Sequence, residues 1–308
     1  MKTLKLQIAV SLAAIVLVSG IILAFAYAAG VTKSIEAEDA TPNGTSVQND
    51  PSASASKALS FMGAAPPVAQ GCATNGTGGT LTDATDQSYS GSAGTAQYHL
   101  FGQGLPTDKP LGLMLQFHGD GAEEFDNLRE GTLEGYAEQA KQREMLLIAI
   151  RTPDSGTVTW WEDGGTNAEW VRDFLENEIY PKYNINRSNA WLIGYSGGSV
   201  FITSFLVHGH SDLFCGGGSI AFGGGGRPYS GQGAAQSQEF INSFTMKWYT
   251  GQEDVAANAS DGYDALSDAK EGEAYYREKG FETSIETPAG IDHYSIPFVE
   301  VVTRLLPQ

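Results

Sequence analysis

Short hydrophobic runs alternate with helical patterns from about residue 96 to the end of the chain. Leu111–Phe117 and Met145–Ile150 are almost continuously apolar, which is typical of strands that are buried on both faces. The further predicted strands are Trp191–Ile193, Ile220–Phe222, Phe244–Tyr249 and the alternating run Phe281–Ile285. Strands and helices in alternation predict an α/β fold with a mostly parallel central sheet and helices on both faces.

Helical periodicity fills the segments between these runs. In Ala168–Tyr180 the apolar residues fall on one face, Thr166 and Glu169 match a capping box, and Pro181 predicts the end of the helix. The segment Ser199–His208 is apolar on nearly all sides, so we expect a buried helix there. The last two predicted helices are Ala265–Lys279 and Pro297–Leu306.

The first 29 residues have the pattern of an export signal or a membrane anchor. Residues 6–32 carry no charge and follow Lys2 and Lys5. The length of the apolar run favours an uncleaved anchor, whereas small residues in an A-x-A arrangement favour cleavage after Ala28. Under both interpretations we expect the rest of the chain to lie outside the cytoplasm, because the only positive flank is at the front.

Residues 30–95 are rich in small and polar residues and are predicted to be a low-complexity linker or extension. Within it, residues 35–61 resemble the opening strands of β-sandwich carbohydrate-binding modules, although an acidic linker is the interpretation that we favour. Residues 96–308 are then the predicted catalytic domain.

Charge and cysteine content narrow the possible functions. The 308 residues include 36 Asp and Glu against 18 Lys and Arg, a formal net charge of −18. Binding to nucleic acid is not expected, because no basic excess exists to replace counterions. Cys72 and Cys215 alone cannot form a four-ligand zinc site, and in an exported protein they are expected to form a disulfide or to remain two buried thiols. We predict no metal and no cofactor, since the chain has no nucleotide-binding or zinc-protease motif.

The sequence Gly194-Tyr195-Ser196-Gly197-Gly198 matches G-x-S-x-G and lies between a predicted strand and a predicted buried helix. That context is the one that a nucleophile elbow requires. The sharp turn needs small neighbours, which the glycines provide. It presents the Ser196 hydroxyl above the sheet and directs the Gly197 N–H towards the reacting oxygen.

A serine nucleophile needs a general base and an acid that orients it. With an elbow of this kind the chain order is Ser, acid, His, and His293 is the histidine in the loop after the last predicted strand. Asp254, directly after the strand Phe244–Tyr249, is our candidate acid. Glu253, and less strongly Asp261 and Asp264, are alternatives in the same loop.

The second oxyanion donor is expected in the turn His118-Gly119-Asp120-Gly121, which follows an apolar strand. The backbone N–H of Asp120 or Gly121 is the candidate, and His118 is expected to shape the turn. The Asp120 side chain should point away, because a carboxylate would oppose the developing negative charge. The candidate substrate contacts are Tyr195, Trp160 and Trp161, with aromatic core packing as the alternative for the two tryptophans.

Taken together, HGDG at 118–121, GYSGG at 194–198, GQED at 251–254 and IDHY at 291–294 resemble an α/β-hydrolase over residues 96–308. The stretch FLENEIYPKYNINRSNAWLIGYSGG at 174–198 is similar to extracellular polyhydroxyalkanoate depolymerases and feruloyl esterases, with Asn186 where Asp is usual. The resemblance implies ester hydrolysis through an acyl-enzyme, with Ser196, Asp254 and His293 as the catalytic residues.

The leading hypothesis is therefore an exported serine esterase that acts on feruloyl or acetyl esters of polysaccharides, or on polyhydroxyalkanoate. A serine peptidase of the same fold is one alternative, since a triad also acylates on amides. A non-catalytic, hydrolase-like binding or adhesion protein is the other. The sequence predicts no oligomeric state.

Overall fold

The computed structural model describes residues 45–49, 57–61, 71–91, 93–128, 131–229 and 236–307. The chain divides into two units, Met1–Met62 and Gly63–Gln308. In the first unit, β1 (Thr45–Asn49) pairs with β2 (Lys57–Phe61) in an antiparallel hairpin. The predicted signal or anchor lies outside the described residues, and the segment 35–61 lies only partly within them. In the described part of the chain, every helix is too short or too polar to span a lipid bilayer.

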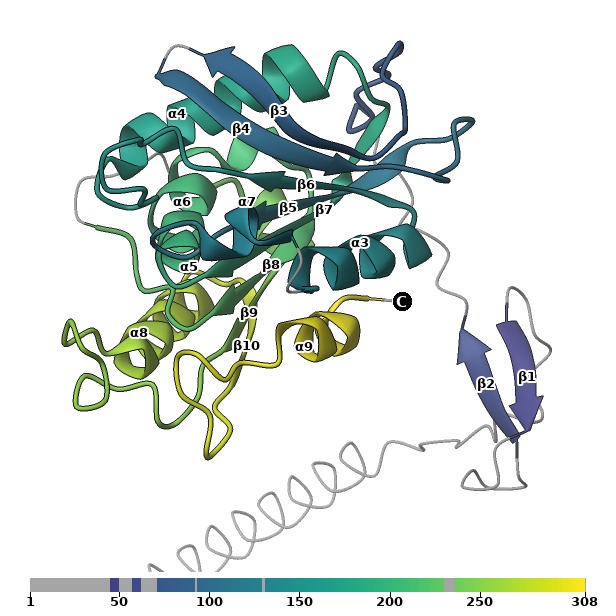
Figure 1. Ribbon diagram of the computed structural model, residues 1–308. Coiled ribbons are helices and arrows are strands. Elements are labelled where there is room, and N and C mark those ends of the chain that lie inside the picture. The colour runs from purple at the N-terminus through teal and green to yellow at the C-terminus, as the bar shows by residue number, and fades with distance from the viewer. Residues whose placement is uncertain are drawn as a thin grey trace, which may run out of the picture. The chain divides into compact units, whose positions relative to one another are not determined.

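The second unit is built on an eight-stranded sheet in the order β10-β9-β8-β7-β5-β6-β4-β3. The strands from β6 to β10 pair in parallel, and β4 and β3 are antiparallel at one edge (Figure 1). The prediction of a mostly parallel sheet is confirmed. The strands are β3 (Ala84–Gly91), β4 (Gly94–Phe101), β5 (Leu111–Phe117), β6 (Met145–Ile150), β7 (Ile185–Tyr195), β8 (Gly217–Phe222), β9 (Phe244–Tyr249) and β10 (Glu282–Glu286).

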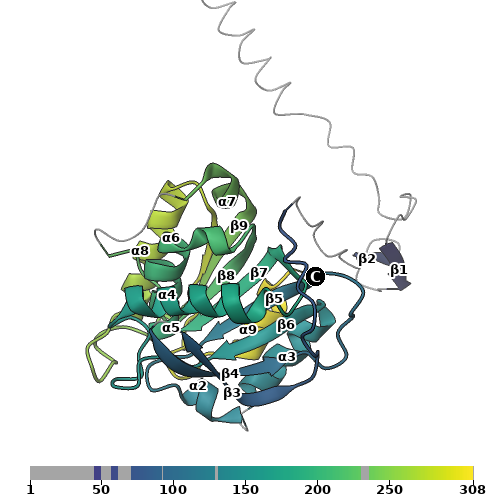
Figure 2. The same cartoon turned by 90° about the horizontal axis from the view of Figure 1, so that it is seen from above.

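Helices cover both faces of this sheet, as the sequence predicts (Figures 1 and 2). One face packs against α2 (Glu123–Asp126), α3 (Thr132–Gln142) and α9 (Phe298–Leu305). The other face packs against α4 (Gly164–Phe174), α5 (Gly197–Phe201), α6 (Val207–Gly209), α7 (Gln238–Ser243) and α8 (Ala265–Glu278). Two π-helical turns, Leu175–Ile179 and Ile202–Leu206, continue α4 and α5.

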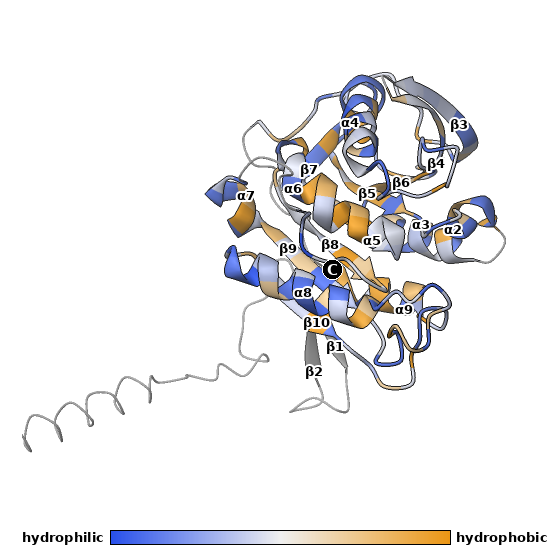
Figure 3. Cartoon of the chain, turned by 90° about the vertical axis from the view of Figure 1, so that its left-hand side faces the viewer, coloured by the Kyte–Doolittle hydropathy of each residue, from blue (hydrophilic) through white to orange (hydrophobic). Residues whose placement is uncertain are grey.

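The central strands are buried on both faces, which explains the almost continuously apolar sequences of β5 and β6. On β5, Leu113 and Leu115 enter one hydrophobic cluster, and Met114 between them enters the other. Successive side chains of a strand point to opposite faces, so a strand covered on both sides favours apolar residues at nearly every position. Figure 3 shows α8 as mostly hydrophilic, in keeping with its exposed face.

The second unit begins earlier than the predicted catalytic domain. It spans Gly63–Gln308, and β3 and the first residues of β4, which lie before residue 96, belong to its sheet. Neither β3 nor β4 was among the predicted strands; β3 is an edge strand whose residues are mostly exposed. An exposed edge strand needs no hydrophobic face and therefore leaves no apolar pattern in the sequence.

The helix that precedes the elbow strand also starts before its predicted position. α4 begins at Gly164 after Asp163, and Thr166 lies inside its first turn, donating a hydrogen bond to Asp163 Oδ1 over 2.8 Å. The predicted capping box of Thr166 and Glu169 is therefore wrong. Asp163 is a residue type common at helix N-termini, and it stands three residues nearer the chain start than Thr166.

A disulfide joins Cys72 to Cys215, whose Cα atoms are 6.1 Å apart. The chain next to Cys72 follows the start of β7, where the Thr74 N–H donates to Ile185 O over 3.0 Å and the Arg187 N–H donates to Cys72 O over 2.9 Å. The bridge thus fastens the N-terminal part of the unit to the sheet across a sequence separation of 143 residues.

We expect the disulfide to contribute substantially to stability. Changing both Cys72 and Cys215 to Ala should lower the free energy of unfolding by about 2–5 kcal/mol, because the unfolded chain regains the freedom of a long closed loop. Thermal unfolding with and without reductant measures this effect. Reductant should lower the Tm of the wild type and leave that of the double variant unchanged; an equal Tm for all samples would contradict the prediction.

Candidate active site

The site forms at the carboxyl edge of the parallel strands, where the chain order of the sheet reverses. β6 lies on one side of β5 and β7 lies on the other, so the loops after β5 and β7 leave the sheet in opposite directions. Ligands bind at such switch points in open α/β sheets. The turn at Asp120 follows β5, Ser196 follows β7, Asp254 follows β9 and His293 follows β10.

Ser196 occupies a sharp turn between β7 and α5, with φ 48° and ψ −115°. A positive φ is strained for a residue with a side chain. The turn is possible because its neighbours are glycines. A Cβ at Gly198 would lie 2.3 Å from Phe117 O, and one at Gly194 would lie 2.7 Å from Gly198 O. The sequence predicts this strained turn, and the glycines allow the helix to start directly against the ends of the strands.

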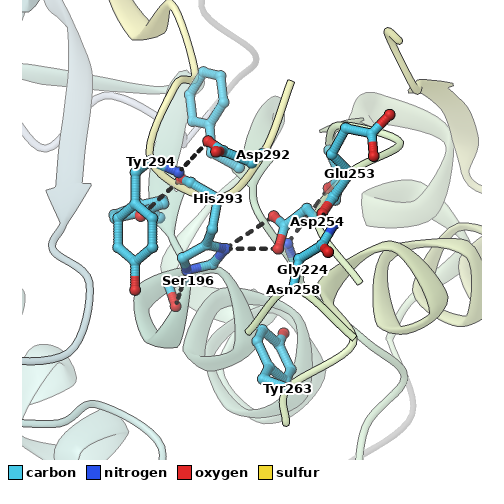
Figure 4. Close-up of polar contacts among 12 residues, drawn as sticks. Ser196, Gly224, Glu253, Asp254, Asn258, Tyr263, Asp292, His293 and Tyr294 are labelled. Carbon is cyan, nitrogen blue, oxygen red and sulfur yellow. Dashed lines mark hydrogen bonds and ion pairs between the residues drawn. The ribbon is translucent and has the colours of Figure 1, made fainter. Parts of the chain in front are cut away.

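His293 lies between Ser196 and Asp254 and is hydrogen-bonded to both (Figure 4). Its Nε2 is 3.0 Å from Ser196 Oγ, and its Nδ1 is 2.8 Å from Asp254 Oδ2 and 3.0 Å from Oδ1. An ionised carboxylate only accepts hydrogen bonds, so Nδ1 carries the proton. Nε2 is then free to accept the proton of the Ser196 hydroxyl, which is the arrangement of a catalytic triad.

Of the acids in the loop after β9, only Asp254 contacts His293. Asp254 is 3% exposed, whereas Glu253 is exposed and its side chain points away from the imidazole in Figure 4. Asp261 accepts a hydrogen bond from the Tyr263 N–H, and Asp264 caps α8 by accepting one from the Ser267 N–H. The geometry therefore favours Asp254 over the three alternatives.

Two tyrosines hold the imidazole in place. The Tyr195 hydroxyl donates to the backbone oxygen of His293 over 2.9 Å, and its ring centroid lies 5.0 Å from that of His293. Tyr263 presents an edge-to-face contact at 6.2 Å, and its hydroxyl donates to Asp268 Oδ2 over 2.8 Å. Tyr195, expected as a substrate contact, thus also supports the base. Tyr263 was not among the predicted site residues, because it lies in a loop without any motif.

Two backbone N–H groups beside Ser196 are available for an oxyanion. Over the residues that the structure describes, the N–H groups of Gly197 and Asp120 have no hydrogen-bond partner. The third candidate is excluded, because the Gly121 N–H donates to Val158 O over 3.1 Å. The prediction for Gly121 is therefore wrong: its N–H ties the turn after β5 to the neighbouring loop.

The Asp120 side chain does not point away from the site, contrary to the sequence-based expectation. Its Oδ2 accepts a hydrogen bond from Trp161 Nε1 over 3.0 Å, and a Cβ built on Gly197 would lie 2.0 Å from its Oδ1. The carboxylate therefore stands directly beside the nucleophile turn. Loss of contact with water raises the pKa of Asp120 above the usual value for Asp, and the Trp161 hydrogen bond opposes that rise.

The two adjacent tryptophans have different environments. Trp160 is 0% exposed and stacks on Phe201 with ring centroids 4.7 Å apart, so it belongs to the core. The prediction that Trp160 contacts substrate is wrong, and the alternative of core packing applies. Trp161 is 37% exposed and remains a candidate for contact with a ligand.

His118 is fully buried and shapes the turn after β5. Its Nε2 accepts a hydrogen bond from the Thr152 N–H over 3.0 Å, so Nδ1 carries the proton and donates to Gly119 O over 2.6 Å. Burial lowers the pKa of His118 to about 4. A neutral imidazole is therefore a structural part of this turn.

The buried imidazole predicts a loss of stability in acid. The pKa of His118 is lower in the folded state (about 4) than in the unfolded state (6.5). The contribution of neutral His118 to the free energy of unfolding is therefore complete above pH 6.5 and is lost as the pH falls towards 4. The free energy of unfolding should drop by about 2 kcal/mol through this group between pH 7.5 and 5. Urea unfolding of the His118→Asn variant should show a pH dependence that is weaker by this amount, and an unchanged dependence would contradict the assignment.

A cavity of about 490 Å³ opens onto the hydroxyl of Ser196. His293, Tyr195 and Asp120 line it together with acidic and aromatic residues of the surrounding loops. Among the described residues, no group of three or more His, Cys, Asp or Glu side chains is arranged to hold a metal ion. The groups beside the Ser196 hydroxyl are the His293 imidazole, the Asp254 carboxylate behind it and the N–H groups of Gly197 and Asp120.

No family model and no curated protein matches the sequence. Solved structures share its fold at low identity. Poly(aspartic acid) hydrolase-1 from Sphingomonas sp. KT-1 is 12% identical with a TM-score of 0.52, and the match covers 74% of this chain and 99% of that one. The Bacillus cereus carboxylesterase is 17% identical with a TM-score of 0.50, covering 68% and 92%. A thermostable esterase is 15% identical with a TM-score of 0.50, covering 71% and 59%.

Proposed function

The chain has the α/β-hydrolase fold, and from this premise we propose that it is a serine hydrolase that cleaves carboxylic esters through an acyl-enzyme. The observation that carries the proposal is the unbroken hydrogen-bonded series Ser196–His293–Asp254 beside two unpaired backbone donors. A binding or adhesion protein of the same fold has no need of this arrangement, so we favour an enzyme.

In the first half of the reaction, Ser196 Oγ attacks the ester carbonyl carbon while His293 Nε2 takes the hydroxyl proton. The carbonyl oxygen becomes an oxyanion and accepts hydrogen bonds from the N–H groups of Gly197 and Asp120. Asp254 stabilises the imidazolium. The C–O bond to the alcohol then breaks, the alcohol leaves with the proton from His293, and the acyl group stays on Ser196.

In the second half, water takes the place of the alcohol. His293 accepts a proton from the water, whose oxygen attacks the acyl carbon and forms a second oxyanion in the same place. Collapse of this intermediate breaks the bond to Ser196 Oγ, which recovers its proton from His293. The free acid leaves and the site returns to its starting state.

The substrate and the location that we propose are those that the sequence favours: esters of polysaccharides or polyhydroxyalkanoate, hydrolysed outside the cytoplasm. A second hollow of about 910 Å³ supports a polymeric substrate. Trp161, Phe205 and Tyr229 line it, and Trp161 is also hydrogen-bonded to Asp120 in the catalytic cavity. Aromatic faces beside a catalytic cavity suit the rings or repeating units of a longer chain.

An amidase or peptidase is the second candidate, favoured by the structural likeness to a poly(aspartic acid) hydrolase. Matched acetyl substrates separate the two activities in the full chain. We expect rapid release of nitrophenol from p-nitrophenyl acetate and butyrate, and much slower release of nitroaniline from p-nitroacetanilide. Faster cleavage of the anilide would make the amidase the better proposal, and absence of turnover on all three would contradict a hydrolase.

A further inference from the structure

Carboxylates surround the nucleophile in the catalytic cavity. Of the described residues that line it, none is Lys or Arg. Besides the triad acid, the lining includes Asp120, Glu123, Glu124, Glu253, Asp261 and Asp292. Glu123 and Glu124 come from α2, and the others come from the loops after β5, β9 and β10, so several separate segments of the chain contribute carboxylates to the lining.

Five of these carboxylates form no ion pair with the Lys and Arg side chains that the structure describes. Within the described ranges, the ion pairs formed by Lys and Arg lie elsewhere, for example between Arg172 and Asp212 and between Arg304 and Glu286. Those ion pairs include none of Asp120, Glu123, Glu253, Asp261 and Asp292. Among the described residues, the Lys and Arg ion pairs thus lie on other surfaces, and the described lining of the cavity is rich in carboxylates.

Among these carboxylates, Asp120 has the most direct consequence for catalysis. Trp161 Nε1 holds it against Gly197, one of the two proposed oxyanion donors. A negative charge at this point opposes the oxyanion that forms during catalysis, unless a positive charge lies beside it. A substrate that brings its own cation would remove this conflict and would gain the attraction of the other carboxylates.

Aromatic side chains complete the lining. Tyr195, Tyr263, Tyr294 and Phe298 line the same cavity, and Tyr294 is 83% exposed. An ammonium group is attracted to aromatic faces, and proteins recognise quaternary ammonium ligands by combining aromatic rings in this way. Carboxylates and aromatic rings together therefore fit a ligand with an ammonium group better than carboxylates alone would.

We propose that the catalytic cavity selects esters that carry an ammonium group and rejects esters that carry a negative charge. This inference rests on the proposed esterase function, whose substrate class it names. Among polysaccharide esters, those on amino sugars are favoured and those on uronic acids are disfavoured. A cleft lined by charge of one sign raises the local concentration and the association rate of oppositely charged ligands by about 10- to 1,000-fold.

The test uses three acetyl thioesters that differ in charge and share one acyl group. Acetylthiocholine is cationic, 3,3-dimethylbutyl thioacetate is its neutral isostere, and S-acetyl-3-mercaptopropanesulfonate is anionic. At low salt, kcat/KM of the full chain should be at least about tenfold higher for the cation than for the neutral ester, and lowest for the anion. Added NaCl should shrink these ratios, because it shortens the range of electrostatic attraction.

Variants locate the effect in the cavity. The triple variant Glu123→Gln, Glu253→Gln, Asp261→Asn, which spares both oxyanion donors, should lower the ratio of cation to neutral ester several-fold while hydrolysis of the neutral ester continues. The matched control Asp108→Asn, Glu138→Gln, Glu239→Gln removes the same number of charges from exposed positions outside the cavity. It should keep the wild-type ratio.

The outcomes distinguish this inference from the function on which it rests. Equal kcat/KM for the cationic and neutral esters, or a ratio that falls equally in both triple variants, overturns the charge selectivity and leaves an esterase. Failure to hydrolyse any of the three thioesters contradicts the esterase function and therefore the inference as well.

Discussion

The Ser196→Ala variant is expected to lose about 10⁶-fold in kcat on p-nitrophenyl acetate, the size of effect that follows removal of a triad nucleophile. Without the hydroxyl, no acyl-enzyme forms. The Ser196 oxygen that lies 3.0 Å from His293 Nε2 is then missing, so the imidazole has no nucleophile to deprotonate. Residual catalysis would come only from the oxyanion donors and from binding. Initial rates of nitrophenol release, compared with the rate in buffer, measure the loss.

The matched control is Ser155→Ala. Ser155 is an exposed serine that does not line the catalytic cavity, and its replacement should leave kcat within twofold of wild type. Circular dichroism and the Tm confirm that both variants are folded. If Ser196→Ala keeps more than a hundredth of the wild-type rate, Ser196 is not the nucleophile.

Asp254→Asn should reduce kcat by about 10⁴-fold. The carboxylate accepts the Nδ1 proton of His293 over 2.8 Å and thereby fixes the tautomer. The amide of Asn can donate to Nδ1 instead, which moves the imidazole proton to Nε2. An Nε2 that already carries a proton cannot accept one from Ser196, so the base is lost although the packing is retained.

Two further acids test whether this effect is specific. Glu253→Gln changes the neighbouring side chain, which does not contact His293, and should cost less than tenfold. Asp108→Asn alters an exposed carboxylate ahead of β5, at the opposite end of the strand from the site, and should leave kcat unchanged. A loss of less than tenfold for Asp254→Asn, or a larger loss for Glu253→Gln, would move the orienting role to another acid.

Much of the catalytic unit could be predicted because its central strands and its elbow are tightly constrained. The sequence predicts β5, β6 and β9 with their observed bounds, and β5 and β6 stand out because strands covered on both faces are apolar at nearly every position. Ser196 is recognisable because Gly194 and Gly198 leave no room for a Cβ. The order of the strands then brings the loops with Asp254 and His293 to the same edge.

The features that the sequence did not predict, or predicted wrongly, depend on contacts between residues that are distant in the chain. β3 is mostly exposed and carries no apolar period. The orientation of the Asp120 side chain depends on the indole N–H of Trp161, which is 41 residues away in the chain. Trp160 and Trp161 are adjacent in sequence, yet one lies in the core and the other at the surface. Composition shows the acidic excess, but only the fold shows how much of it surrounds Ser196.

Covalent labelling is the most direct measurement of the central claim, that His293 and Asp254 make Ser196 a nucleophile. A fluorophosphonate reacts with an activated serine and stays attached, so mass spectrometry of the digested protein identifies the labelled residue. We predict rapid labelling of wild type on the peptide that contains Ser196, and labelling slowed by several orders of magnitude in His293→Ala and Asp254→Asn. Labelling of another residue, or equal rates in the wild type and both variants, would contradict this account.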